Sequence, residues 1–148
     1  MVVQEIAVKA ERIVCDDVPD NPLLTFSNAW RIGNEVVMSG MTARPAIPGA
    51  STPASAYDQT TVVLRKLEAL VTAAGGHKHN LIKTVVYLTD MKDREDVGRA
   101  RRDFFGPEGE GCYPTSTLVA VSALVSTELK VEIDAWARLD IDLRNSAQ

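Results

Sequence analysis

The sequence predicts an α/β (α+β) domain in which two helices cover one face of a sheet. Three observations favour this fold class. Short β-branched stretches alternate with two stretches of helical periodicity, glycine and proline stand at the boundaries, and the chain has 148 residues. A chain of this length buries about 70% of its unfolded surface, which is enough for one core but not for two. We therefore expect a single domain over residues 1–148.

A hairpin is predicted in the first third of the chain. Residues 30–32 and 35–39 flank Gly33 and Asn34, a two-residue connection in which both residues tolerate a positive φ. An earlier strand is expected within residues 2–14. Residues 44–55, RPAIPGASTPAS, contain three prolines. Because proline interrupts both helices and central strands, this stretch is expected to form a surface loop.

The helices follow from their periodicity and their boundaries. Residues 57–74 repeat apolar or small side chains at helical spacing, and Gly75 is expected to end this helix. The second helix is expected from Asp93, as its N-cap, to Phe105. Between the two helices, residues 81–88 are β-branched and apolar on both faces, which is typical of a buried strand.

Two further strands are predicted, over residues 117–124 and 129–138. Along the last of these, apolar residues alternate with a polar set that includes Glu132 and Asp134. Two helices can cover only one face of such a sheet, yet residues 81–88 and 118–124 offer apolar side chains to both faces. The uncovered face is therefore expected to pack against copies of the same chain, with functional grooves between subunits.

Composition and charge exclude several classes of protein. The net charge of −4 and the pI near 5.2 argue against a nucleic-acid partner. No apolar run reaches membrane-spanning length, so no membrane partner is expected. Two distant cysteines, Cys15 and Cys112, predict neither a disulfide scaffold nor a metal site, and a cytoplasmic location is expected. His77 and His79 lack a third ligand nearby and are expected in a solvated turn, so no metal is predicted.

Three segments carry a resemblance to a known family: WRIGNEVVMSG at residues 30–40, residues 82–105, and CYPTSTLVAVSALVSTELKVEIDA at residues 112–135. Over residues 20–138 the chain resembles the Rid family of reactive intermediate deaminases, also called the YjgF or RidA family and the L-PSP endoribonuclease family. The resemblance implies a chorismate-mutase-like (bacillary) fold with a mixed sheet. It further implies a homotrimer with a small-molecule ligand in each inter-subunit cleft.

The resemblance also implies roles for particular residues. In deaminating members, a glutamate orders the attacking water, and its position is retained as Glu132. The arginine that grips the substrate carboxylate is replaced by Ser116. The tyrosine and asparagine that line the cleft fall on Phe26 and Gly98. This chain is therefore a divergent member that lacks the cleft arginine, and a serine hydroxyl does not supply bidentate charge-assisted contacts.

The remaining candidates surround this segment. With Ser116, Thr117 forms a hydroxyl-rich edge that could receive a neutral oxygen, and Cys112 and Tyr113 lie next to it. No histidine pairs with Cys112 in a recognisable motif, so it is not expected to act as a nucleophile. Alternatively, another arginine enters the cleft. The arginines considered are Arg31, Arg44, Arg99 and Arg102.

Two functions are compatible with these residues. The first is a Rid-like small-molecule hydrolase that deaminates an imine or enamine other than a simple 2-imino acid. In this enzyme Glu132 would be the acid/base and no cofactor would be needed, because an imine is already electrophilic. The second is a non-catalytic trimer of the same fold that binds a small ligand or has a regulatory role.

Overall fold

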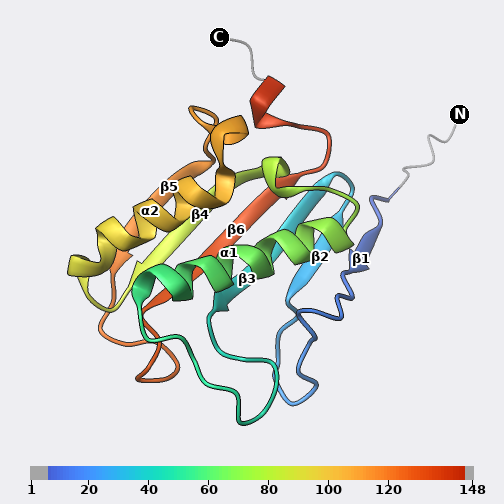
Figure 1. Cartoon of the computed structure of the whole chain (residues 1–148). Helices are drawn as coiled ribbons and strands as arrows, with labels where there is room; N and C mark the ends of the chain where they lie inside the picture. Colours follow the sequence, from blue (N-terminus) through green and yellow to red (C-terminus); the bar gives the residue numbers. More distant parts are fainter. Residues whose placement is uncertain (1–6, 146–148) are drawn as a thin grey trace, which may run out of the picture.

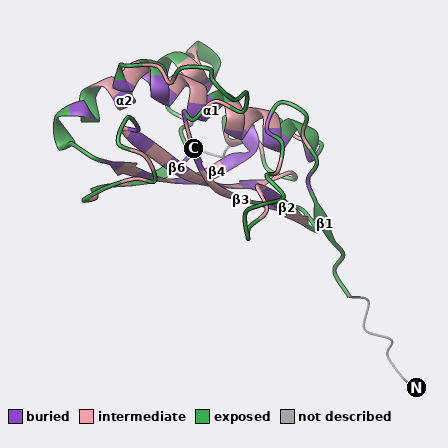
Figure 2. Ribbon diagram, turned by 90° about the horizontal axis from the view of Figure 1, so that it is seen from below, coloured by how far each residue is buried: buried purple, intermediate pink, exposed green. Residues whose placement is uncertain are grey.

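The computed structural model describes residues 7–145 and shows a six-stranded sheet with two helices on one face (Figures 1 and 2). The strand order is β1-β2-β3-β6-β4-β5. All neighbouring strands are antiparallel except β4 and β5, which are parallel. The sheet is therefore mixed, and the predicted fold class is confirmed.

The first three strands form an antiparallel meander. They are β1 (Ala10–Arg12), β2 (Ala29–Ile32) and β3 (Glu35–Thr42). The predicted hairpin joins β2 to β3, and Gly33 has a φ of 61°. Asn34 does not share this positive φ, so the turn has the type II′ pattern, with glycine at its first central position. Residues 2–6 of the expected first strand lie outside the described residues.

Helix α1 (Ala56–Ala73) lies over the middle of the sheet. Ser55 caps it by accepting a hydrogen bond from the Asp58 backbone N–H, and Gly75 follows its end with a φ of 100°. The periodic face is fully buried against the sheet, as the spacing predicts. Its buried apolar residues are Ala56, Val63, Leu64, Leu67, Leu70 and Val71.

The second helix begins differently from the prediction. Strand β4 (Leu81–Leu88) leads into a 3₁₀ turn (Met91–Asp93) and then into α2 (Arg94–Phe105). The Asp93 side chain makes no capping hydrogen bond, whereas Asp90 accepts one from the Lys92 backbone N–H. The cap therefore lies before the extra turn. Further 3₁₀ turns occupy Lys78–Asn80, Pro107–Gly109 and Leu143–Asn145.

The last two strands are β5 (Thr115–Ala120) and β6 (Val131–Arg138). The prediction that the first of these continues to residue 124 is wrong. The Val121 backbone N–H still donates to the Leu88 carbonyl at 2.8 Å, but β4 ends there. The apolar residues after Ala120 therefore do not continue β5 past the end of its partner β4. β5 is an edge strand of the sheet.

The face opposite the helices is uncovered in the single chain (Figure 2). On this face Trp30 lies beside Val37, which lies beside Trp136, across three neighbouring strands. The Lys83 ammonium stands 5.5 Å from the centre of the Trp136 ring. Exposed Ile32 and Val119 extend the apolar surface. We refer to this side of the sheet as the open face.

The Gln59 side chain connects the loop before α1 to the loop before β6. Its buried side chain donates to the carbonyls of Pro53 and Glu128, at 2.8 and 2.9 Å, and accepts from the Lys130 N–H at 2.8 Å. The substitution Gln59→Met keeps the side-chain volume but leaves two carbonyls and one N–H without hydrogen-bond partners. We therefore expect the unfolding free energy, measured in urea, to fall by about 2–4 kcal/mol. Exposed Arg65→Ala should change stability by less than ~0.5 kcal/mol, and an equally small effect of Gln59→Met would contradict this role.

Candidate functional site

Two carboxylates stand together on the open face. Glu132 and Asp134 project from β6 on the same side, because side chains two apart in a strand share a face. Gly40 of β3 makes room for both of them. A Cβ atom at residue 40 would lie 2.6 Å from Glu132 Oε1 and 2.9 Å from Asp134 Oδ1. Gly40 lies within a register irregularity between Met38 and Met41, in agreement with the close approach that a glycine permits.

The two carboxylates have different surroundings. Asp134 Oδ2 accepts a hydrogen bond from the Tyr87 hydroxyl at 3.1 Å. Within residues 7–145, the Glu132 carboxylate has neither a hydrogen-bond donor nor a cation within 4.0 Å. Burial, and secondly the charge of Asp134, raise the pKa of Glu132 above its ordinary value. A half-buried carboxyl with a raised pKa is suited to proton transfer.

A second group of candidates lies where α2 passes over β5. Ser116 pairs with buried Thr84 across the parallel strands. The Arg101 guanidinium, from α2, donates to Ser116 Oγ at 2.7 Å and more distantly to Thr84 Oγ1 at 3.5 Å. Gly98 lies one helical turn before Arg101 and is exposed, with open space where a side chain would stand.

Cys112 and Tyr113 lie in the segment that leads into β5. The Cys112 backbone N–H donates to the Gly109 carbonyl at 2.9 Å, and its thiol is free and half-buried. The Tyr113 ring packs edge-on against Phe105 at 5.8 Å between centroids, and the residue remains 38% exposed. Both residues therefore line the same end of the molecule as Ser116.

A single chain does not bring Glu132 and Ser116 together. Ser116 is on the helix side of the sheet, since it contacts Arg101 of α2, whereas Glu132 is on the open face beside Tyr87. Thr117 shares the open face, because Val85 lies between it and Asp134 in the sheet. A small molecule on one side of the sheet cannot touch both groups of one chain.

Phe26 belongs to the segment that is fixed to β3 next to Gly40. It precedes β2 and is 55% exposed. The next residues are fixed to β3, since the Ser39 hydroxyl donates to the Ser27 carbonyl and the Ser39 N–H donates to the Asn28 carbonyl. The candidates thus form two half-sites: Phe26, Thr117 and Glu132 belong to the open-face half-site, and Ser116, Gly98, Cys112 and Tyr113 to the edge half-site.

Sequence reasoning missed Arg101. The arginines considered were four others in the chain, and of these Arg99 faces away, with its guanidinium 2.8 Å from Asp96. A signal for Arg101 does exist in the helical spacing. Position 101 follows buried Val97 by four residues, so it lies on the sheet-facing side of α2, where a charge needs a partner.

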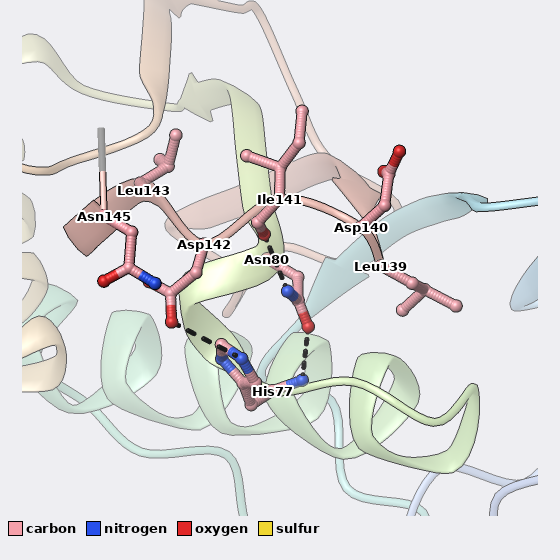
Figure 3. A pocket seen from close by; sticks show the side chains of 8 residues that line it. All are labelled: His77, Asn80, Leu139, Asp140, Ile141, Asp142, Leu143 and Asn145. Carbon is pink, nitrogen blue, oxygen red and sulfur yellow. Dashed lines mark hydrogen bonds and ion pairs between the residues drawn. The ribbon is translucent and has the colours of Figure 1, made fainter. Parts of the chain in front are cut away.

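A cavity of about 460 Å³ lies beyond the C-terminal end of β6, next to the turn after α1 (Figure 3). His77 Nε2 stands 3.7 Å from Asp142 Oδ2, and Asn80 joins the His77 N–H to the Ile141 carbonyl at 2.7 and 2.8 Å. These contacts tie the C-terminal segment to the domain. None of the expected site residues lines this cavity.

The neighbouring histidine differs from the expectation of a solvated turn. His79 is 5% exposed and lies beside Phe105, and its Nδ1 has no partner among the described residues. Burial lowers its pKa, so the neutral imidazole packs as part of the core. Within the described chain, no group of three or more histidine, cysteine or acidic residues could hold a metal ion. No helix of that part is long and apolar enough to cross a membrane.

Comparison with known proteins assigns this arrangement to a family. The family described as Endoribonuclease L-PSP matches residues 19–139. The chain superposes on the crystal structure of a protein of unknown function from Pseudomonas aeruginosa with a TM-score of 0.85 and 51% identity, covering 95% of this chain and 99% of the other. It also matches the YjgF gene product of E. coli, with a TM-score of 0.77 and 26% identity over 86% of this chain and 98% of the other.

The fold is therefore chorismate-mutase-like, a mixed sheet carrying both helices on one side. The chain belongs to the Endoribonuclease L-PSP family, which is the Rid or YjgF family, and the resemblance is confirmed. The family includes deaminases of reactive intermediates. The chain is 28% identical over 112 residues to a 2-iminobutanoate/2-iminopropanoate deaminase of Mus musculus, which covers 76% of this chain and 79% of the relative.

The surroundings of Glu132 predict a measurable titration. Because burial and Asp134 raise its pKa, the folded protein binds this proton more readily than the unfolded chain does. Its contribution to stability is therefore present below the ordinary pKa of 4.5 and is lost as the pH rises through the raised value. Carboxyl-detected NMR should find the pKa of Glu132 above 4.5, and Asp134→Asn should lower it. Exposed Asp17→Asn should leave it unchanged, and a wild-type value at or below 4.5 would contradict this account.

Proposed function

We propose that this protein is a Rid-type hydrolase that deaminates an imine or enamine other than a simple 2-imino acid. The observation that carries the proposal is the Glu132 carboxylate, which is half-buried and has no partner among the described residues. A desolvated carboxylate costs free energy unless it is protonated or binds something. In the hydrolysis of an imine, the nucleophilic water molecule would bind to this carboxylate.

The reaction balances with Glu132 alone as acid and base. The carboxylate accepts a proton from water while the water oxygen forms a bond to the imine carbon, and the C=N bond becomes a single bond. The protonated carboxyl then returns the proton to nitrogen. This gives a carbinolamine. Glu132 then takes the proton of the new hydroxyl group and passes it to the nitrogen, so that the C–N bond breaks, ammonia leaves, and the C=O bond of the product forms. The imine carbon is already electrophilic, so the proposal includes no cofactor.

The proposal places each site between two copies of the chain in a homotrimer. The open face of one copy carries Glu132 beside an uncovered apolar surface that includes Trp30 and Val37. Burying that surface against the exposed edge of β5 would bring the Ser116 side of the second copy toward Glu132 of the first. The free cysteines agree with a reducing compartment, and the proposal includes a cytoplasmic location.

The substrate class follows from the edge half-site. An arginine at position 116 would have a long side chain that carries its guanidinium away from β5 and into the cleft. Here Ser116 ends at its hydroxyl, and the nearest guanidinium is held back against it by α2. The guanidinium is therefore held close to α2 and does not extend from position 116. Ser116 of one copy and Thr117 of the other would orient a longer or differently placed polar group.

One observation favours the alternative, a ligand-binding or regulatory trimer without turnover. Three positions that line the cleft in deaminating relatives are occupied by Phe26, Gly98 and Ser116, so the polar lining is reduced. A panel of imines and enamines separates the two functions. Ammonia release supports the hydrolase, whereas a thermal shift without a product supports the binding protein.

Replacing the carboxyl tests the hydrolase directly. Glu132→Gln keeps the shape but cannot accept a proton, so we expect ammonia release from the best substrate of the panel to fall by about 10²-fold or more. Glu95→Gln, at an exposed position of α2, is the matched control and should retain full activity. Unchanged turnover in Glu132→Gln, with the trimer intact by sedimentation, would remove the proposed mechanism.

A further inference from the structure

Arg101 is a charged side chain that the proposed reaction does not yet use. It extends from α2 toward β5, is half-buried, and makes its short hydrogen bond to Ser116 Oγ at 2.7 Å. Its second contact, to Thr84 Oγ1, is long at 3.5 Å. Thr84 is itself fixed, since its hydroxyl donates to the Thr115 carbonyl at 3.2 Å. The guanidinium is thus held in place by two hydroxyl groups.

The charge of Arg101 is not balanced by a carboxylate of the described residues. Among residues 7–145, no carboxylate oxygen lies within 4.0 Å of its guanidinium, although Arg99, Arg138 and Arg144 each have an acidic partner. Hydroxyl groups satisfy donors but carry no negative charge. Arg101 is half-buried, and this burial removes part of the hydration of its charge and lowers its pKa. A desolvated cation without a counter-charge costs free energy that a bound anion would offset.

A neighbouring position of α2 carries no side chain that would cover Arg101. Gly98 lies one turn earlier on α2, is exposed, and has nothing within 4 Å of the place where a side chain would begin. Exposed Tyr113 flanks the same end of the strand. The N–H groups that do not contact Ser116 or Thr84 can donate in parallel to the two oxygens of a carboxylate, which is the geometry that guanidinium groups favour.

We propose that Arg101 recognises a carboxylate of the ligand, so that the anion-binding guanidinium of this site comes from α2 instead of from position 116 of β5. The inference rests on the proposed function for the identity of the substrate as an imine or enamine that carries a carboxylate. Ser116 is then a positioning residue, because its hydroxyl holds the guanidinium against the strand. With serine at position 116 instead of arginine, the positive charge of the cleft comes from a different element and is not lost.

The test measures binding without turnover, using butanoate as the probe and butanamide as its neutral counterpart. NMR titration of the wild-type protein should show butanoate binding at least tenfold more tightly than butanamide. Arg101→Met should abolish that preference, and Arg101→Lys should retain part of it, since the charge remains while the bidentate contact is lost. Arg102→Met, at an exposed neighbouring position with no ion pair among the described residues, should bind butanoate like the wild type.

Three outcomes would overturn the inference. Failure of the wild-type protein to prefer butanoate would do so, as would an unchanged preference in Arg101→Met. If a carboxylate of a neighbouring copy balances Arg101, the substitution should weaken the trimer in sedimentation while butanoate binding persists, and the inference is wrong. Loss of butanoate binding in Arg101→Met, with no ammonia released by the wild type from any imine, would support the inference while rejecting the hydrolase.

A kinetic readout separates recognition from a merely structural role. With an imine that carries a carboxylate, Arg101→Met should raise KM at least tenfold, while an uncharged imine of similar size should show no such rise. Equal losses for both substrates would show that the substitution disturbs the fold of the cleft, and the inference would fail.

Discussion

The alternation of side chains across a β-sheet is the constraint on which the account depends. In β6 it places Glu132 on the open face, while the pairing of β4 with β5 places Ser116 under α2. The two half-sites therefore have the thickness of the sheet between them in any one chain. Chemistry that needs both would have to take them from different copies, and the proposed trimer would bury the uncovered apolar face.

Each half-site also holds a charge that the chain leaves without a partner among its described residues. Glu132 is a half-buried acid without a donor, and Arg101 is a half-buried base without a carboxylate. The Arg99–Asp96 ion pair, by contrast, is exposed and contributes little to stability. The uncompensated charges thus mark the places where a ligand and water would gain most from binding.

Much of this could be predicted from the sequence, because periodicity records burial. The faces of α1 and β6 and the turn at Gly33 are confirmed. Other features depend on tertiary partners that periodicity does not record. The end of β5 is set by the length of β4, and the burial of His79 by its contact with Phe105. Arg101 was missed because the resemblance directed attention to position 116, whereas the guanidinium reaches the same place from another element.

Mixing two impaired variants tests the shared site most directly. With a carboxylate-bearing imine at a concentration far below KM, Glu132→Gln alone should keep about 1% of wild-type ammonia release or less, and Arg101→Met alone about a tenth or less. Trimers reassembled from equal amounts of the two should regain about a quarter, because random cyclic assembly joins an intact open-face half-site to an intact edge half-site in about one interface of four. Mixed trimers, verified by native mass measurement, whose activity does not exceed the average of the separate variants would contradict a site built from two copies.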